Sequence, residues 1–195
     1  MGKGKPVLVI DPGHGGRDPG AIDPIYGIQE KRITLNVALY LKEWALRKGS
    51  FTPYLTRDDD SHVSLDERCF TSNACGADAF LSIHCNARER RGKPGIEIEA
   101  YHFPGSEKGR IFAGLISNKL EDQLLLRGEP FFNRGVKTYP YYVLKHTKAP
   151  AVLVELGFLS DPEEAVWLVG SKNQEALAAA LGVASERFLL GGQCS

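Results

Sequence analysis

Residues 6–16 read PVLVIDPGHGG, an unbroken apolar segment that runs into aspartate, proline, glycine and histidine. A continuous apolar run of this length is typical of a strand buried on both faces of a parallel sheet. Further along, short apolar segments alternate with stretches of helical periodicity, and no repeat or low-complexity linker divides them. This alternation predicts an α/β fold with a largely parallel or mixed sheet, organised as one domain over residues 1–195.

The composition excludes several classes of protein. Of the 195 residues, 43% are apolar and 25% are charged, and 24 Lys and Arg residues balance 24 Asp and Glu residues. This balance gives no support to nucleic-acid binding. The longest apolar run near the start, residues 7–10, is too short for an export signal or a membrane span. We therefore expect no nucleic-acid partner, no membrane insertion and no export signal within this chain.

Periodicity and capping residues predict the elements of the fold. Ser64 and Glu67 have the spacing of a capping box, and Gly49 is a helix stop. In the strand after Gly95, isoleucine alternates with Glu97 and Glu99, which predicts one buried and one polar face. Strands are predicted at residues 6–11, 51–56, 78–84, 95–103, 141–145 and 151–155, helices at 31–48, 106–126 and 173–190 and from residues 64 and 161, and long loops at 12–29 and 127–140.

Polar side chains follow the apolar strands at three places. His14 follows the first strand, His84 ends the strand that begins at residue 78, and Glu155 ends the strand that begins at residue 151. If these strands are parallel, the three side chains emerge at the same carboxyl edge of the sheet, where open α/β sheets bind ligands. Glu30 lies at the far end of the first long loop, beside the start of a helix.

Two histidines and two glutamates are the donor set of a hydrolytic zinc centre. Catalytic zinc often takes two His and one Glu and keeps a fourth position for water, while a nearby carboxylate accepts the proton of that water. Spacing alone does not establish a metal site, because each histidine considered singly could be a solvated or hydrogen-bonded side chain. Glu155 is different, since a carboxylate at the end of an apolar strand needs a charge, a metal or a proton.

Nine segments of the chain match one known family in order: VLVIDPGHGGRDPGA (7–21), QEKRITLNVALYL (29–41), LTRDDD (55–60), SLDERC (64–69), ADAFLSIHCNA (77–87), GIEI (95–98), NRGVK (133–137), YYVLK (141–145) and PAVLVELGFLSDPEE (150–164). Through these segments the chain resembles the zinc-dependent N-acetylmuramoyl-L-alanine amidases of bacterial cell walls and related phage endolysin catalytic domains. The resemblance implies a single domain with about six strands flanked by helices on both faces. It implies that His14, Glu30 and His84 bind Zn²⁺ and that Glu155 is the catalytic glutamate. The implied reaction hydrolyses the amide between the lactyl group of N-acetylmuramic acid and L-alanine.

The resemblance also implies a partner and a location. Peptidoglycan is the expected partner, the cell envelope is the expected location, a monomer is expected, and a separate wall-binding domain would lie outside these residues. Some family members carry a long insertion with a helix that blocks the zinc. Only 34 residues, 99–132, separate the corresponding segments here, so an open site is expected. Arg57, Asp58 and Arg68 match motifs away from the metal and are assigned to fold and loop stability.

Two other functions stay open at this point. One is a catalytically silent wall-binding module that has kept the fold, and the presence of all four residues (His14, Glu30, His84 and Glu155) argues against it. The other is a zinc peptidase or deacetylase with a different substrate, which the donor set alone does not exclude. The new end group that the protein generates on its substrate would distinguish them.

Overall fold

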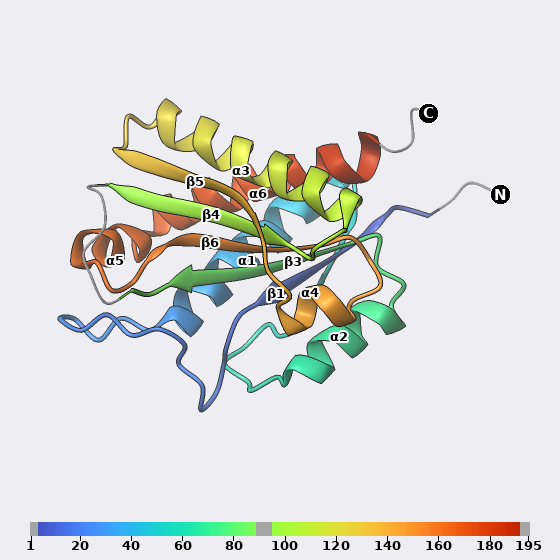
Figure 1. The fold of residues 1–195 in the computed structure, drawn as a ribbon, viewed down its shortest axis with the longest axis horizontal. Coiled ribbons are helices and arrows are strands. Elements are labelled where there is room, and N and C mark those ends of the chain that lie inside the picture. The colour runs from blue at the N-terminus through green and yellow to red at the C-terminus, as the bar shows by residue number, and fades with distance from the viewer. Residues whose placement is uncertain (1–3, 89–94, 192–195) are drawn as a thin grey trace.

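A single six-stranded mixed sheet forms the centre of the computed structural model, which describes residues 4–88 and 95–191 (Figure 1). The strands are β1 (Val7–Pro12), β2 (Thr52–Leu55), β3 (Ala79–Asn86), β4 (Ile96–His102), β5 (Phe131–Thr138) and β6 (Ala151–Phe158). Their order across the sheet is β2-β1-β3-β6-β4-β5. The helices are α1 (Glu30–Lys48), α2 (Leu65–Ala74), α3 (Glu107–Leu126), α4 (Tyr142–His146), α5 (Pro162–Leu168) and α6 (Ser171–Gly191).

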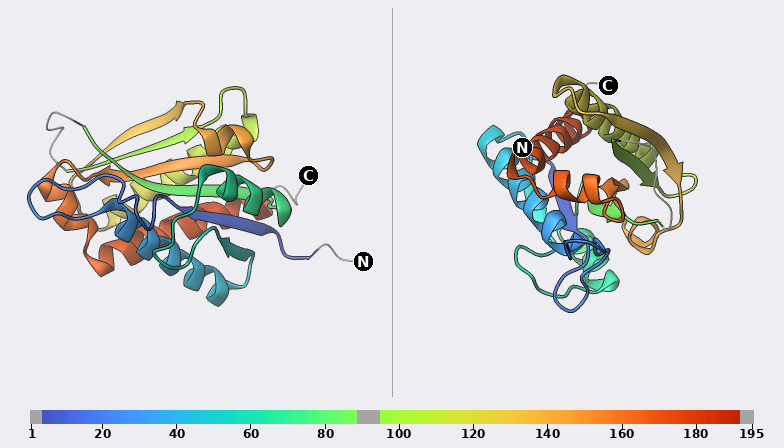
Figure 2. Two further views of the ribbon diagram at one scale, coloured as in Figure 1. Left: turned by 90° about the horizontal axis from the view of Figure 1, so that it is seen from below. Right: turned by 90° about the vertical axis from the view of Figure 1, so that its left-hand side faces the viewer.

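Helices cover both faces of the sheet (Figures 1 and 2). Helices α1, α3 and α6 lie on one face, where the larger hydrophobic core forms, and α2 and α4 lie on the other over a smaller core. No helix within the described residues is both long and apolar enough to cross a membrane. This three-layer arrangement confirms the predicted α/β fold.

The capping residues predicted from the sequence are confirmed at several helix ends. Gly49 caps α1 in the left-handed conformation with φ 69°, which a glycine adopts without a Cβ penalty. Ser64 and Glu67 form the capping box of α2 in both directions. The Asp161 side chain accepts a hydrogen bond from the Glu163 N–H at the start of α5, with Pro162 in the first turn.

The parallel strands place their carboxyl ends side by side. β1 pairs with β3 and β3 pairs with β6, all in parallel. In this register His84 lies beside Glu155, while His14 is two residues beyond the end of β1. The edge of the sheet predicted to carry the polar residues therefore carries three of the four candidates, and the fourth, Glu30, begins α1.

Two predicted elements are wrong. The loop predicted at residues 127–140 contains β5, which pairs in parallel with β4. The glycine, proline and charged residues of this segment suggest a loop. As an edge strand, however, β5 needs only one partly buried side. Gly135 takes a φ of 80° at the point where the register with β4 shifts. The strand predicted at residues 141–145 is the short helix α4 instead. Its β-branched and aromatic residues favour a strand locally, but the second core packs Val143 and Leu144 as part of a helix.

The polar face of β4 is buried, unlike the polar faces of most half-exposed strands. Glu97 and Glu99 are only 1% and 3% exposed. Arg134 pairs with both carboxylates, and Lys137 pairs with Glu99. The alternation of isoleucine and glutamate predicts the two faces correctly, but burial of the second one depends on cations from β5 and on Arg88, which follows β3 and pairs with Glu97 at 2.6 Å.

Candidate metal centre

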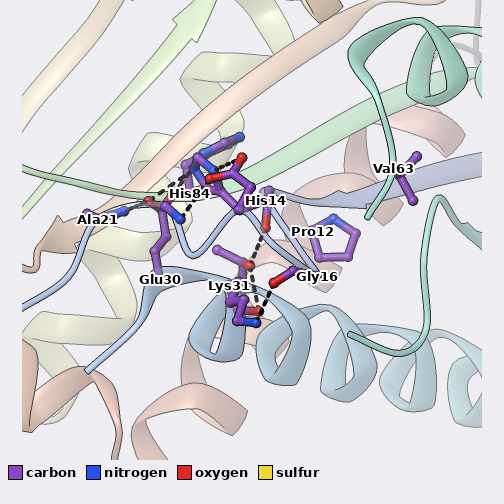
Figure 3. Close-up of polar contacts among 12 residues, drawn as sticks. Pro12, His14, Gly16, Ala21, Glu30, Lys31, Val63 and His84 are labelled. Carbon is purple, nitrogen blue, oxygen red and sulfur yellow. Dashed lines mark hydrogen bonds and ion pairs between the residues drawn. The ribbon is translucent and has the colours of Figure 1, made fainter. Parts of the chain in front are cut away.

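His14, Glu30 and His84 converge on one point, from the loop after β1, the first turn of α1 and the end of β3 (Figure 3). One ligand atom from each lies within 4.8 Å of the others. Residues that are 16 and 54 positions apart in the chain are thereby brought into the spacing that a single ion requires.

The Glu30 carboxylate lies between the two imidazoles. Its Oε2 atom is 3.1 Å from Nε2 of His14, and its Oε1 atom is 2.9 Å from Nδ1 of His84. Two backbone N–H groups also donate to it, from Ala21 at 2.8 Å and from Cys85 at 2.9 Å. Glu30 is 3% exposed, so its side chain is fixed by these four contacts.

Contacts within the cluster shift the pKa values of Glu30 and His14. Burial alone would raise the pKa of Glu30, but the hydrogen bonds from His14 and His84 outweigh it and hold that pKa well below the ordinary value. Burial alone would lower the pKa of His14, but Glu30 and then Asp18 outweigh it and raise that pKa to about 9. A carboxylate that is ionised and held between imidazoles fits a divalent cation, which would replace the protons on the rings.

Two buried arginines hold the loop that carries His14. Arg57 donates from Nε to the Pro12 carbonyl at 3.0 Å and from Nη2 to the Gly13 carbonyl at 2.8 Å. Arg68 donates from Nη1 to the Pro12 carbonyl and from Nη2 to the His14 carbonyl, both at 2.7 Å. His14 has a φ of 62°, unusual for a residue other than glycine. The arginines keep it there, so the prediction that Arg57 and Arg68 stabilise the loop agrees with these contacts.

Lys31 connects the loop at Gly16 to the neighbouring loop that carries Asp60 (Figure 3). Its ammonium donates to the Gly16 carbonyl at 2.8 Å and to the Asp60 carboxylate at 2.7 Å. Asp60 in turn accepts a hydrogen bond from the Gly16 N–H at 3.0 Å. Lys31 thus fixes the backbone on the far side of His14 as the arginines fix the near side.

The space next to Gly20 is filled by the side chains of Glu30 and His14. A Cβ atom on Gly20 would lie 2.4 Å from Oε2 of Glu30 and 2.6 Å from Cδ2 of His14. The residue also has a φ of 67°, which strains any residue with a side chain. Glycine at this position is therefore required both by the backbone and by the two candidate ligands.

Asp18 is a site residue that our sequence analysis missed. Its Oδ2 atom lies 2.8 Å from Nδ1 of His14, and its Oδ1 atom accepts a hydrogen bond from the Gly20 N–H at 3.1 Å. A carboxylate on the second ring nitrogen commonly fixes the orientation of a metal-binding histidine. The signal was present as an aspartate four residues after His14, although it is indistinguishable from a turn aspartate without the fold.

Glu155 lies beside the three-residue cluster. It occupies β6 next to His84 on β3, is 7% exposed, and its Oε2 atom makes no hydrogen bond to any residue that the structure describes. Burial raises the pKa of Glu155 to about 7; His84 opposes this shift, and the negative charges of Glu30 and Glu99 add to it. A group with that pKa can exchange a proton near neutral pH, as a general base and acid must.

A pocket of about 310 Å³ opens beside the cluster. His14, His84 and Glu155 form part of its wall. The rest of the wall comes largely from the N-terminal ends of α2 and α4 and from β6, and its apolar members are Val63, Leu65, Tyr141, Tyr142, Val143 and Leu153. The candidate metal centre is therefore accessible from a cavity, as the prediction of an open site requires.

An α/β sheet with two imidazoles and one carboxylate at a carboxyl edge, and a second carboxylate at the start of the adjoining helix, is typical of metal-dependent hydrolases. Comparison with known proteins narrows this class to one family. The family model described as N-acetylmuramoyl-L-alanine amidase matches residues 8–185, and the chain belongs to this family. The resemblance found in the sequence is thereby confirmed.

The most similar relatives include two larger proteins. N-acetylmuramoyl-L-alanine amidase CwlM of Bacillus licheniformis is 37% identical over 175 residues, which are 88% of this chain and 64% of that protein. The probable cell wall amidase LytH of Staphylococcus aureus is 36% identical over 176 residues, 90% of this chain and 55% of that protein. The chain thus spans less than two thirds of the length of either relative.

Solved structures of the family have the same fold. An N-acetylmuramoyl-L-alanine amidase from Clostridium difficile 630 has a TM-score of 0.85 at 27% identity, covering 93% of this chain and 95% of that one. The amidase AmiC2 of Nostoc punctiforme has a TM-score of 0.84 at 30% identity, with complete coverage of both chains. The match confirms the fold class predicted from the sequence.

Proposed function

We propose that this chain is a zinc-dependent peptidoglycan amidase, which cleaves the amide between the lactyl group of N-acetylmuramic acid and the L-alanine of the stem peptide. Membership of the amidase family supports this reaction. The observation that carries the proposal is the convergence of His14, Glu30 and His84 within 4.8 Å, with Glu155 on the adjacent strand.

The donor set fits zinc better than the other common divalent ions. Two imidazoles and one carboxylate are a frequent protein ligand set of catalytic zinc, whereas calcium and magnesium prefer oxygen ligands. His14, Glu30 and His84 would hold the ion, and Asp18 would orient the His14 ring. Zinc supplies Lewis-acid chemistry when bound, since it polarises a carbonyl oxygen and acidifies water.

Glu155 is the proposed catalytic residue. Its buried carboxylate takes a proton from the attacking water and returns it to the nitrogen of the departing alanine. The pKa of about 7 suits both halves of this transfer, because the group is partly ionised at neutral pH and holds a proton readily. The Oε2 atom of Glu155 has no hydrogen-bond partner within residues 4–88 and 95–191, and this supports the same role, because a free oxygen can accept the proton.

The cellular setting follows from the substrate. Peptidoglycan lies outside the cytoplasmic membrane, so we place the protein in the cell envelope, in line with the cell wall amidases among its relatives. We infer that residues 1–195 form one catalytic domain that acts as a monomer. A wall-binding domain, where one takes part, would lie outside these residues.

Digestion of purified sacculi tests the proposal. We expect the zinc-loaded protein to release intact stem peptides that carry a free alanine amine, and a chelator to stop the release. Absence of any release would favour a silent wall-binding module. A different new end group, such as an amino sugar or an internal peptide amine, would favour a deacetylase or a peptidase.

A further inference from the structure

We propose that the turn formed by Ile25 and Tyr26 is a second contact with the substrate, where a sugar ring of the glycan strand packs at a distance from the scissile bond. This inference rests on the proposed amidase function and names the part of the substrate that is bound outside the metal centre. Four features of the turn carry it: its exposure, its rigidity, its connection to Glu30 and its lack of exposed charge.

The turn exposes two large apolar side chains next to each other in the sequence. Ile25 is 62% exposed and Tyr26 is 63% exposed. Both belong to the loop between β1 and α1, which is drawn in blue in Figure 1 and extends outward beyond the start of α1. Tyrosine is enriched where proteins bind their partners, because it combines an apolar ring with a polar hydroxyl. The pair therefore has the composition of a contact surface.

Backbone hydrogen bonds and a buried aspartate hold the turn in one conformation. The Asp23 N–H donates to the Ile28 carbonyl at 2.9 Å, and the Gly27 N–H donates to the Asp23 carbonyl at 3.1 Å. The Asp23 side chain is 1% exposed and accepts hydrogen bonds from the N–H groups of Ile25 and Tyr26. Because the backbone is already ordered, a ligand that binds here loses less free energy to ordering than it would on a free loop.

The base of the turn is bonded to the candidate metal centre. The Ala21 N–H donates to Oε2 of Glu30 at 2.8 Å, and the Glu30 N–H donates to the Ala21 carbonyl at 2.9 Å (Figure 3). Ile22 and Gln29 form an antiparallel bridge next to this pair. Tyr26 is four positions before Glu30, so the Cα atoms of the two residues are at most about 14 Å apart. A polymer that is bound at the metal centre can therefore also reach the turn.

The chemistry of the turn favours a sugar ring as its ligand. Ile25 and Tyr26 are outside the wall of the pocket beside the cluster, so they meet the substrate away from the scissile bond. Residues 22–29 contain no lysine or arginine, and their single carboxylate, Asp23, is buried. Charge therefore attracts neither an anionic lipid surface nor the carboxylates of a stem peptide. A sugar ring has C–H groups on its faces and hydroxyls at its edge, which match the ring and the hydroxyl of Tyr26.

The test compares Tyr26→Ala with the unaltered zinc-loaded protein on two substrates: purified sacculi, and soluble N-acetylmuramoyl-L-alanyl-D-isoglutamine, which has a single sugar. We expect Tyr26→Ala to lower kcat/KM on sacculi about fivefold to tenfold, mainly through KM, and to leave kcat/KM on the soluble compound unchanged. Tyr26→Trp should retain activity on sacculi, because it keeps an aromatic ring. Sedimentation of the chelator-treated proteins with sacculi should show the same loss of binding in Tyr26→Ala without any hydrolysis.

Tyr54→Ala is the matched control, because Tyr54 is 52% exposed on the edge strand β2. It should leave both kcat/KM values and the sedimentation unchanged. The inference is overturned if Tyr26→Ala leaves hydrolysis and binding of sacculi unchanged, or if it slows both substrates equally, which would place its effect at Glu30. Loss of binding to phosphatidylcholine vesicles and not to sacculi would assign the turn to a membrane instead. Failure of the proposed function is separate, since the unaltered protein would then hydrolyse neither substrate while sedimentation still measures the contribution of Tyr26.

Discussion

Glu99 and Glu155 lie directly opposite each other across the antiparallel ladder of β4 and β6, so their side chains share one face of the sheet. Their surroundings differ. Burial would raise the pKa of Glu99, but hydrogen bonds from Lys137 and Arg134 outweigh it and lower that pKa. For Glu155, burial outweighs the opposing charge of His84 and raises the pKa to about 7. Two glutamates on neighbouring strands thus have opposite protonation behaviour, and only Glu155 is suited to proton transfer.

The first prediction concerns stability without metal. Glu155→Gln should stabilise the chelator-treated protein at pH 8. The pKa of Glu155 is about 7 in the folded state and 4.5 in its ordinary state. As the pH rises, Glu155 therefore loses its proton at a lower pH in the unfolded chain than in the folded one. The ionised carboxyl then destabilises the fold by at most about 3 kcal/mol above pH 7, and by nothing below pH 4.5. Urea unfolding at pH 4 and pH 8 measures this. If the free energies of unfolding of the variant and the unaltered protein differ by the same amount at pH 4 and pH 8, the substitution acts through packing instead.

The second prediction concerns the reaction. Glu155→Gln should keep its zinc and lose turnover by about 10²–10⁴-fold, the range for a missing acid–base group. The amide side chain has nearly the same shape as the carboxyl but does not accept the proton. Zinc content by elemental analysis and release of stem peptide from sacculi give the two readouts. Near-normal activity would refute the catalytic role.

The third prediction concerns the metal itself. His84→Ala should abolish zinc retention, because one of three protein ligands is removed. His146→Ala is the control, since His146 is exposed on α4 and outside the cluster. Both proteins are dialysed against buffer without zinc and then assayed for bound metal. Equal zinc content in the two variants would contradict the assignment of His84.

The fourth prediction compares two glycines that have the same backbone φ angle. Gly20 and Gly27 both have a φ of 67°, but a Cβ on Gly27 meets nothing within 4 Å. Each change to alanine should destabilise the fold by about 1–2 kcal/mol through the left-handed conformation. Only Gly20→Ala should also weaken zinc binding, by about tenfold or more, because it displaces His14 and Glu30. Competition with a chromogenic chelator measures the affinity. Parallel losses of affinity would show that the backbone, and not the clash, is responsible.

Local signals explain why much of the fold was predictable. The apolar run of β1, the capping box at Ser64 and the glycine after α1 act over a few residues, and tertiary contacts do not oppose them. The candidate site was predictable for a related reason. Polar residues that end buried strands have few alternatives to a role at the edge of the sheet.

The errors lie where long-range contacts decide the structure. β5 is a strand because β4 pairs with it, although proline, glycine and asparagine in the segment favour a loop. α4 is a helix because the second core places it against α2 and β6, against its strand propensity. Asp18 was missed because its partner, the second nitrogen of His14, is defined only once the loop has folded.

The carbonyls around His14 are bonded by Arg57 and Arg68, and not by any candidate ligand. The backbone of the loop at residues 12–14 is therefore held by groups other than the side chains that would bind the metal. We therefore expect a substitution of His14 by another residue to change the ligand set and to leave the arginine contacts with the backbone in place. Backbone shape and ligand identity are in this sense controlled by different residues.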